Sequence, residues 1–360
     1  MAALEFHSLT EIAKRARTQL PKGSWDYLIG GSETETTLRR NRLAIDQLGF
    51  KPRVLRDVST IDLTSTFLGQ SSRIPVFVAP VGQLNHFTPG AAADVAKACA
   101  EFGVPQFLSS ASPPALEEVA ASSPDLHAIF QLYVTGGPDF VDEYINRVEA
   151  AGYRGFCLTV DTAWYSRRER DVLNRWGIRW ATAGFGAGSA ALASLSWADV
   201  ERARAKTTLP LILKGIATAE DARLAVEHGV DVVYVSNHGG RQLDHGRGSL
   251  EVLPEIVAEV GEDATVVVDG SFARGTDILK AIALGASAVG LGRVACMGLA
   301  AGGSEGLVRV LELIEDEMRR SAGLLGVTSL AELDPACVVP APAVSSPNAL
   351  SAFPLIEQGY

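Results

Sequence analysis

The segment with the clearest capacity for chemistry is Asn237–Arg241, which places a histidine, two glycines and an arginine in five residues. A histidine such as His238 is the residue type most often used as a general base near neutral pH. The two glycines after it let a substrate approach closely, and Arg241 could hold a carboxylate bidentately beside the imidazole. A lone histidine is more often structural, so this interpretation depends on what else reaches the same place.

Other reactive side chains stand directly after apolar segments. Asp161 could orient the imidazole and stabilise its protonated form. Lys214 would be a fixed positive charge beside developing negative charge, although a lysine can also simply extend to solvent or form a Schiff base. The Schiff-base alternative leaves the histidine–arginine pair unexplained. A phosphate site is favoured by Gly270, Gly292 and Arg293, because the two glycines allow close approach of the backbone and the arginine supplies a forked, charged guanidinium.

A repeated unit would bring these side chains together. Amphipathic helices followed by a glycine and a short apolar strand recur along the chain, as in the helix at 219–228, which Thr218 should cap. Continuous apolar strands are typical of parallel sheets covered on both faces. We therefore predict an α/β fold, a (β/α)8 TIM barrel, whose active site lies at the carboxyl ends of its strands. The predicted strands are 74–79, 104–108, 128–134, 155–158, 209–213, 230–235, 265–268 and 286–291.

The chain reads as one domain over residues 1–360. Residues 1–70 should form an N-terminal helical cap with a short hairpin, 71–322 the barrel, and 323–360 a C-terminal tail. The segment 177–195, after the fourth strand, is rich in Gly, Ala and Ser. A barrel loop of this length and composition is typical of a flexible lid.

Composition excludes several other classes. Lys and Arg number 32 against 42 Asp and Glu, giving a formal charge of -10, which argues against nucleic acid and anionic membranes as partners. The N-terminus carries charged residues throughout and resembles neither a signal peptide nor an anchor. No run of about 18 apolar residues occurs. Four scattered cysteines form no CxxC pair, so we expect no metal site, no disulfide framework and a cytoplasmic location.

Several motifs resemble the FMN-dependent α-hydroxy acid oxidase/dehydrogenase family, which includes glycolate oxidase, lactate oxidase and mandelate-type enzymes. The resemblance extends from about residue 24 to 330, and SNHGGRQLD is its most specific motif. It implies a barrel with FMN at the carboxyl-end mouth. The motifs are SNHGGRQLD at 236–244, FQLY at 130–133, LKG at 213–215, GTDILKAIALG at 275–285, and the segment 160–168.

The resemblance also implies a role for each residue that matches. His238 is the active-site base, Asp161 its orienting partner, and Lys214 a charge beside the flavin N1/O2 edge. Tyr133 belongs to both the catalytic and the substrate groups. The other substrate-binding residues are Tyr27, Ala111, Arg168 and Arg241. The FMN-binding residues are Ala79, Pro80, Val81, Ser109, Gln131, Thr159, Lys214, Ser236, Asp269, Gly270, Ser271, Arg274, Gly292 and Arg293.

The implied reaction is oxidation of an (S)-2-hydroxy acid to the 2-keto acid, with electrons passed to O2 to give H2O2. Hydride transfer and prior removal of the C2 proton both remain open. A dehydrogenase that uses a quinone or carrier, and a flavin-binding barrel without catalysis, are the alternatives. Relatives are often homotetramers, so a homo-oligomer is expected.

This chain departs from the family pattern in ways that bear on its ligands. Ala111 stands where many relatives have a bulky side chain, and Leu28 replaces a frequent aromatic, so we predict a substrate larger than glycolate. In the family's DGG-x-R-x-G motif, Ala273 takes the place of a phosphate-binding arginine. Two outcomes are open: Arg274 compensates, or the mononucleotide is held less tightly. Residues 162–166 replace the usual turn before Arg168, and the 19-residue lid is too short for a membrane segment.

Overall fold

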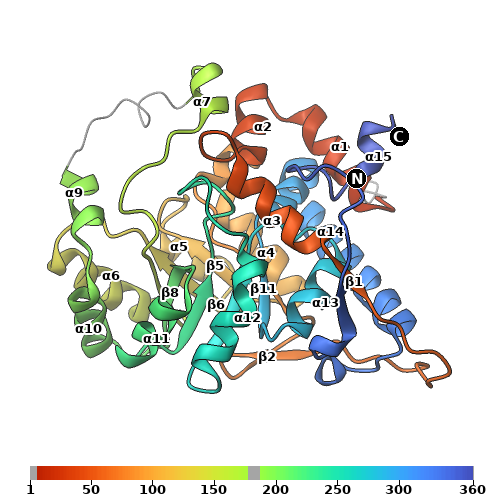
Figure 1. Ribbon diagram of the computed structural model, residues 1–360. Coiled ribbons are helices and arrows are strands. Elements are labelled where there is room, and N and C mark those ends of the chain that lie inside the picture. Colours follow the sequence, from red (N-terminus) through yellow and green to blue (C-terminus); the bar gives the residue numbers. More distant parts are fainter. Residues whose placement is uncertain (1–5, 177–186, 360) are drawn as a thin grey trace.

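A closed barrel of eight parallel strands forms the centre of the computed structural model, which describes residues 6–176 and 187–359 (Figure 1). The barrel closes where β11 pairs with β4, and each strand otherwise pairs with its neighbours in the chain. This confirms the predicted (β/α)8 fold. The strands are β4 (Val76–Val78), β5 (Gln106–Ser109), β6 (Ala128–Leu132), β7 (Phe156–Thr159), β8 (Leu211–Ile216), β9 (Val232–Val235), β10 (Thr265–Asp269) and β11 (Ala288–Leu291).

Alternation along each strand separates two cores. Inward-facing side chains such as Phe77, Phe107 and Tyr234 fill the barrel, with ring centroids 4.7 to 5.6 Å apart. Their neighbours, such as Val76 and Val78, face outward and join the larger core beneath the helices. The continuous apolar runs therefore arise because both faces of the sheet are buried.

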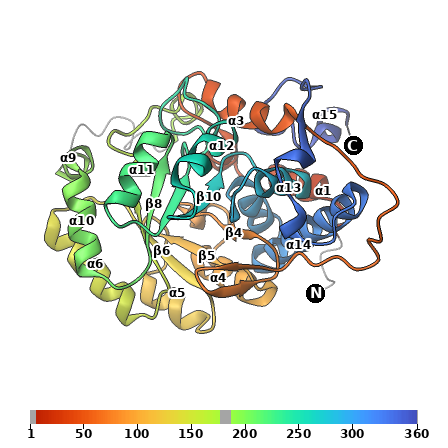
Figure 2. The same cartoon turned by 60° about the horizontal axis from the view of Figure 1, so that its bottom comes forward.

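Helices surround the barrel on its outside (Figure 2). Thr218 caps α11 as predicted, since its side chain accepts a hydrogen bond from the Asp221 N–H. α14 is long and apolar enough to cross a bilayer, but buried side chains along it pack against α1, α4 and α13. The helices are α4 (Ala91–Phe102), α5 (Leu116–Ser122), α6 (Pro138–Ala150), α10 (Trp197–Lys206), α11 (Ala219–Glu227), α12 (Ser249–Val260), α13 (Gly275–Ala283) and α14 (Arg293–Leu325).

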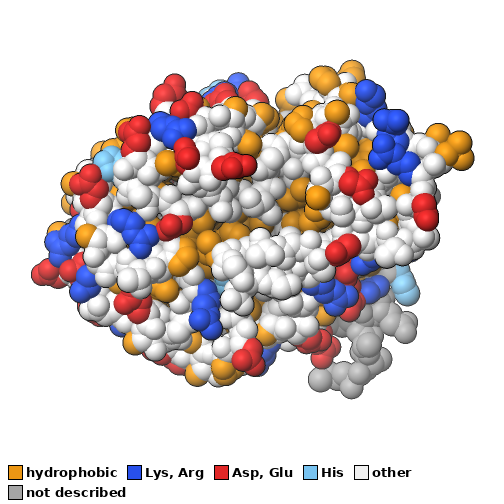
Figure 3. All heavy atoms as spheres, turned by 90° about the horizontal axis from the view of Figure 1, so that it is seen from below, with side chains coloured by type: hydrophobic (Ala, Val, Ile, Leu, Met, Phe, Trp, Pro, Cys, Tyr) orange, Lys and Arg blue, Asp and Glu red, His pale blue; other side chains and the backbone are white. Residues whose placement is uncertain are grey.

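The N-terminal residues cover both ends of the barrel. The antiparallel hairpin of β2 (Ser65–Phe67) and β3 (Gln70–Ser72) closes the amino-terminal end, where Phe67 joins the inner core. On that face, charges of both signs are interspersed (Figure 3). At the other end of the barrel, three helices form the cap: α1 (Leu9–Gln19), α2 (Lys22–Ile29) and α3 (Thr36–Asp46). β1 (Leu48–Phe50) pairs with β12 (Val338–Pro340) of the C-terminal tail, which ends in α15 (Pro354–Glu357).

The predicted lid falls partly outside the described residues, which omit 177–186. The short helix α7 (Glu169–Leu173) precedes this gap, and α9 (Ala187–Ser194) follows it. Leu192 of α9 is buried. A lid function for 177–195 stays a prediction.

Candidate active site

The imidazole of His238 lies between a carboxylate and a phenol. Its Nδ1 is 3.0 Å from Asp161 Oδ1, and its Nε2 is 3.1 Å from the Tyr133 hydroxyl. The three residues follow β9, β7 and β6, so the barrel brings together side chains that are far apart in sequence. This is the arrangement that a general base with an orienting partner requires.

Electrostatics fix the protonation of this group. Burial alone would raise the pKa of Asp161, but His238 and Lys214 outweigh burial and hold that pKa below its ordinary value. Burial lowers the pKa of His238 below its ordinary value, although Asp161 acts in the opposite direction. Asp161 therefore raises the basicity of the imidazole, as an orienting carboxylate should, while burial determines the net direction of the pKa. A neutral ring therefore donates from Nδ1 to the carboxylate and accepts at Nε2 from Tyr133, which leaves Nε2 as the basic atom.

An unusual backbone conformation presents this imidazole. His238, Gly239 and Gly240 have successive φ values of 60°, 65° and 75°. Left-handed φ is costly for a residue with a Cβ, and at Gly240 a Cβ would also lie 2.4 Å from the Leu38 backbone N in α3. The second glycine is therefore required because the cap helix packs directly on this loop.

Two guanidinium groups lie beside the imidazole. Arg241 donates to the backbone carbonyls of Tyr27 (2.6 Å) and Gly30 (2.9 Å), and its guanidinium carbon lies 4.7 Å from the Tyr27 ring centroid. Burial, together with the charge of Arg168, lowers the pKa of Arg241 to about 9. Arg168 Nε is buried without a hydrogen-bond partner in the described part of the chain. An anionic ligand would stabilise both cations, and a carboxylate suits the geometry of their guanidinium groups.

Lys214 is held by a buried polar cluster. Its Nζ lies 3.1 Å from Ser236 Oγ and 4.0 Å from Asp269 Oδ2. Ser236 Oγ donates to Asp269 Oδ1 at 2.6 Å, and the Tyr234 hydroxyl donates to Asp269 Oδ2 at 2.8 Å. The side chain is therefore fixed in the barrel mouth and does not extend to solvent.

A cavity of about 630 Å³ opens at the carboxyl ends of the strands and includes most of the predicted residues. Ser109, Gln131, Thr159, Asp161, Ser236 and Arg274 are absent from its lining. All but Arg274 lie at strand ends or in the loops directly after them. The predicted residues that line it are Tyr27, Ala79, Pro80, Val81, Ala111, Tyr133, Arg168, Lys214, His238, Arg241, Asp269, Gly270, Ser271, Gly292 and Arg293.

Several buried polar atoms around this cavity have no hydrogen-bond partner among residues 6–176 and 187–359. They comprise both amide atoms of Gln131, Thr159 Oγ1, Ser271 Oγ and Arg293 Nε. Unsatisfied buried groups are costly and uncommon in folded proteins. Ser271 and Arg293 line the cavity, and Gln131 and Thr159 lie near the carboxyl ends of β6 and β7, which face the same mouth. Unsatisfied groups at this mouth favour a polar ligand with donors, acceptors and an anionic group.

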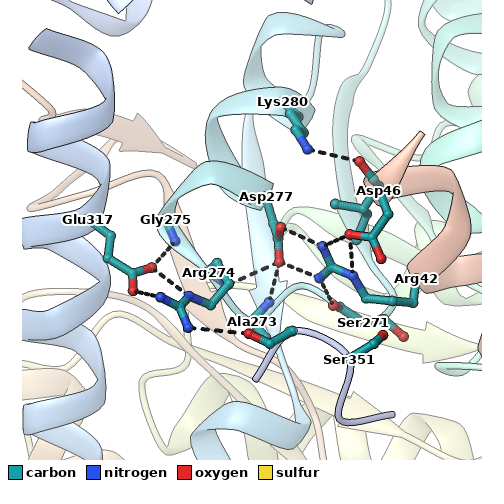
Figure 4. A network of polar contacts seen from close by, with 12 residues as sticks. Arg42, Asp46, Ser271, Ala273, Arg274, Gly275, Asp277, Lys280, Glu317 and Ser351 are labelled. Atoms are coloured by element: carbon teal, nitrogen blue, oxygen red, sulfur yellow. Dashed lines mark hydrogen bonds and ion pairs between the residues drawn. The ribbon is translucent and has the colours of Figure 1, made fainter. Parts of the chain in front are cut away.

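The structure does not bring Arg274 to the cavity that the other predicted phosphate contacts line. Its Nε lies 3.1 Å from Glu317 Oε2, and its guanidinium also donates to the Ala352 carbonyl at 3.3 Å (Figure 4). Arg274 is the extended N-cap residue of α13, with φ −129° and ψ 154°. This conformation and the Glu317 carboxylate draw the side chain toward α14, so it does not replace the missing arginine at Ala273.

Sequence reasoning missed four residues that line the cavity. Trp176 lies 4.9 Å from Tyr27 and 4.7 Å from His86 between ring centroids. Arg42 of α3 and Phe353 of the C-terminal tail also line the cavity. Single aromatic and basic residues of this kind carry no local signal. These four residues lie in the 3-10 helix Leu84–His86, directly after α7, in α3 and in the tail, and tertiary packing places these segments.

Comparison with known proteins agrees with this site. Residues 16–340 match a family model described as FMN-dependent dehydrogenase. Glycolate oxidase 1 of Zea mays is 39% identical over 349 residues, which cover 91% of this chain and 94% of the maize protein. Glycolate oxidase of Spinacia oleracea is 38% identical, over 92% and 95% of the two chains. A crystal structure of mandelate oxidase superposes with a TM-score of 0.86 at 39% identity, over 94% of this chain and all of that one.

Fold and site together define a flavin-dependent barrel oxidoreductase. The chain belongs to the FMN-dependent α-hydroxy acid oxidase/dehydrogenase family, and it is an FMN enzyme. The residues present fit the cofactor, because the unpartnered atoms of Gln131, Thr159 and Ser271 can bond a polar ring and chain. The free Nε of Arg293 and the amino end of α14 suit a phosphate.

Proposed function

We propose that this protein oxidises an (S)-2-hydroxy acid with a side chain larger than that of glycolate to the 2-keto acid. Electrons then pass to O2 and give H2O2. The observation that carries the substrate size is the position of Ala111. Gly82 lies so close that a Cβ there would come 3.2 Å from the Ala111 Cβ. A bulkier side chain at 111 would therefore have to extend into the cavity, where Ala111 instead leaves room.

The cavity wall around the space that Ala111 leaves is aromatic. Tyr27, His86 and Trp176 contact one another edge-on or tilted, and all three line the cavity. Apolar and aromatic walls with a few placed polar groups favour a substrate that has a sizeable apolar or aryl side chain. Mandelate oxidase has been crystallised with benzoyl-formic acid, and a single-residue mutant of it with (S)-mandelic acid, which supports the same substrate class and stereochemistry.

The residues would divide the chemistry as follows. Arg241 and Arg168 bind the substrate carboxylate and so fix the orientation of C2. His238 Nε2 accepts a proton from the substrate, and the negative charge of Asp161 stabilises the imidazolium that results. Lys214 is a fixed cation for negative charge that develops in the cavity. FMN, when bound, accepts the two electrons.

Anaerobic mixing of the yellow holoenzyme with a series from glycolate through lactate to (S)-mandelate tests this function. We expect flavin bleaching to become faster as the side chain grows. Air should then restore the colour with one H2O2 per substrate. Fastest bleaching with glycolate would refute the size argument. Reoxidation by a quinone and not by air would favour the dehydrogenase alternative, and bound flavin that never bleaches would favour a non-catalytic barrel.

The substitution Ala111→Trp tests the wall directly. It should lower kcat/KM for (S)-mandelate at least tenfold while glycolate is affected much less, because the indole would fill the side-chain space. Ala111→Ser is the matched control and should leave the ratio of the two substrates unchanged. A cytoplasmic location and homo-oligomeric assembly stay predictions.

A further inference from the structure

The C-terminal tail contributes to the wall of the active-site cavity. Ala349, Ala352 and Phe353 line it together with Ser271 and Ala273. The family model matches residues 16–340, so these three residues lie beyond the matched range.

The segment is held in place by specific contacts. Arg274 donates to the Ala352 carbonyl and is itself bound by Glu317 of α14, with Nε to Oε2 at 3.1 Å (Figure 4). Phe353 is 1% exposed and belongs to the main core. Its backbone N–H donates to the Leu350 carbonyl at 2.7 Å, so a tight turn presents the phenyl ring to the core.

Compared with the family motif, this end of the cavity lacks one cation. Ala273 stands where the family motif has a phosphate-binding arginine. Arg42 does not supply the missing charge, because Asp277 (2.7 Å) and Asp46 (2.5 Å) already neutralise it. Arg293 differs from Arg42. Its guanidinium donates to the carbonyls of Gly30 and Gly239, and it forms no ion pair with any described carboxylate.

Burial makes this single cation more effective. Desolvation lowers the pKa of Arg293 to about 10, which indicates that the guanidinium lies in a region of low dielectric. The attraction between a buried cation and an anion increases as water is excluded from around them. A protein segment that covers this end of the cavity can therefore partly offset the absence of a second arginine.

We propose that residues 348–353 form part of the FMN site and cover the phosphate end of the cavity in place of the arginine missing at Ala273. Arg274 is then a positioning residue that seats this segment through Ala352. It does not bind phosphate. The proposal concerns cofactor retention and is independent of which hydroxy acid is oxidised. Binding measured without substrate can therefore fail while the proposed function stands, and the reverse also holds.

A pair of isosteric variants provides the first test. Ala352→Asp puts a negative charge into the cavity wall, and Ala352→Asn adds the same volume without charge. FMN and riboflavin are titrated into each apoprotein, and the quenching of flavin fluorescence gives the dissociation constants. We expect Ala352→Asp to bind FMN at least tenfold more weakly than Ala352→Asn, whereas riboflavin, which has no phosphate, differs less than threefold. Equal FMN affinities in the two variants would overturn the proposal.

Loosening the segment is the second test. Arg274→Gln should raise the rate of FMN release at least fivefold and reduce the preference for FMN over riboflavin, and Arg274→Lys should restore part of both. Arg320→Gln, which removes an exposed ion pair with Asp316 on the same helix α14, is the control and should match the wild type. Unchanged release from Arg274→Gln, or tighter FMN binding, would show that the segment does not cover the cofactor.

Discussion

The contact between Asp161 and His238 makes a quantitative prediction for Asp161→Asn. The asparagine side chain keeps an acceptor for the Nδ1–H and removes only the charge. A carboxylate 3.0 Å from an imidazolium nitrogen interacts by about 5 kcal/mol at an effective dielectric of about 20. Roughly half of this applies if the proton is half transferred in the transition state. We therefore expect kcat to fall roughly 100-fold.

The opposite side of the ring gives an internal comparison. Tyr133→Phe removes a neutral hydrogen bond to Nε2, and such a bond contributes about 1 kcal/mol. Its expected cost in kcat is therefore less than tenfold. Both rates are measured by anaerobic stopped-flow reduction of the flavin at saturating substrate, so that oxidation by air does not contribute.

The pH profile adds a readout that a purely structural role would not change. The pKa of His238 is lowered by burial and raised by Asp161, so kcat/KM should decline only below the ordinary histidine range. In Asp161→Asn this acid limb should move further toward low pH, because the raising charge is gone. A loss of kcat under threefold, a loss equal to that of Tyr133→Phe, or an acid limb that moves upward would each refute the assigned role.

Three further predictions concern charge elsewhere in the fold. Lys214→Met should make the flavin reduction potential more negative by on the order of 50 mV, because a nearby buried cation contributes about 2 to 3 kcal/mol. The control is Lys280→Met, which lies outside the cavity lining and should leave the potential unchanged. Equal shifts in the two variants would contradict the role of Lys214. Burial lowers the pKa of His127 to about 4, so the unfolded chain binds a proton below about pH 6.5 before the folded one does. The free energy of unfolding should therefore fall by up to about 2 kcal/mol between pH 6.5 and 5 because of this group. In His127→Leu, chemical denaturation should show a smaller fall over the same pH range. A fall equal to that of the wild type would contradict the prediction. Arg42→Met leaves Asp277 buried without its cation and should cost about 3 to 5 kcal/mol in urea unfolding, whereas a cost under 1 kcal/mol would show that the pair is dispensable.

The barrel, and the meeting of His238, Asp161 and Lys214 at its mouth, could be predicted from the sequence because both depend on local, periodic signals. Each apolar run that ends in polar residues becomes a strand whose carboxyl end lies at one mouth. His238, Asp161 and Lys214 therefore converge as soon as the strand order is known. Trp176 and Arg42 could not be assigned in this way. Their contribution depends on how α7, the residues after it and α3 pack over the mouth, and neither residue type nor spacing specifies that packing.

The substitution at Ala273 shows why neighbouring residues in sequence are poor substitutes for one another at a site. Arg274 is one residue from the position where the family carries its arginine, and the sequence alone made it the natural replacement. Successive side chains in extended backbone point to opposite sides, and Arg274 is extended at φ −129° and ψ 154°. Ala273 accordingly lines the cavity, while Arg274 is absent from its lining and contacts Glu317 and the backbone carbonyl of Ala352. A compensating change therefore has to come from another element that faces the same space, and the C-terminal segment meets that condition.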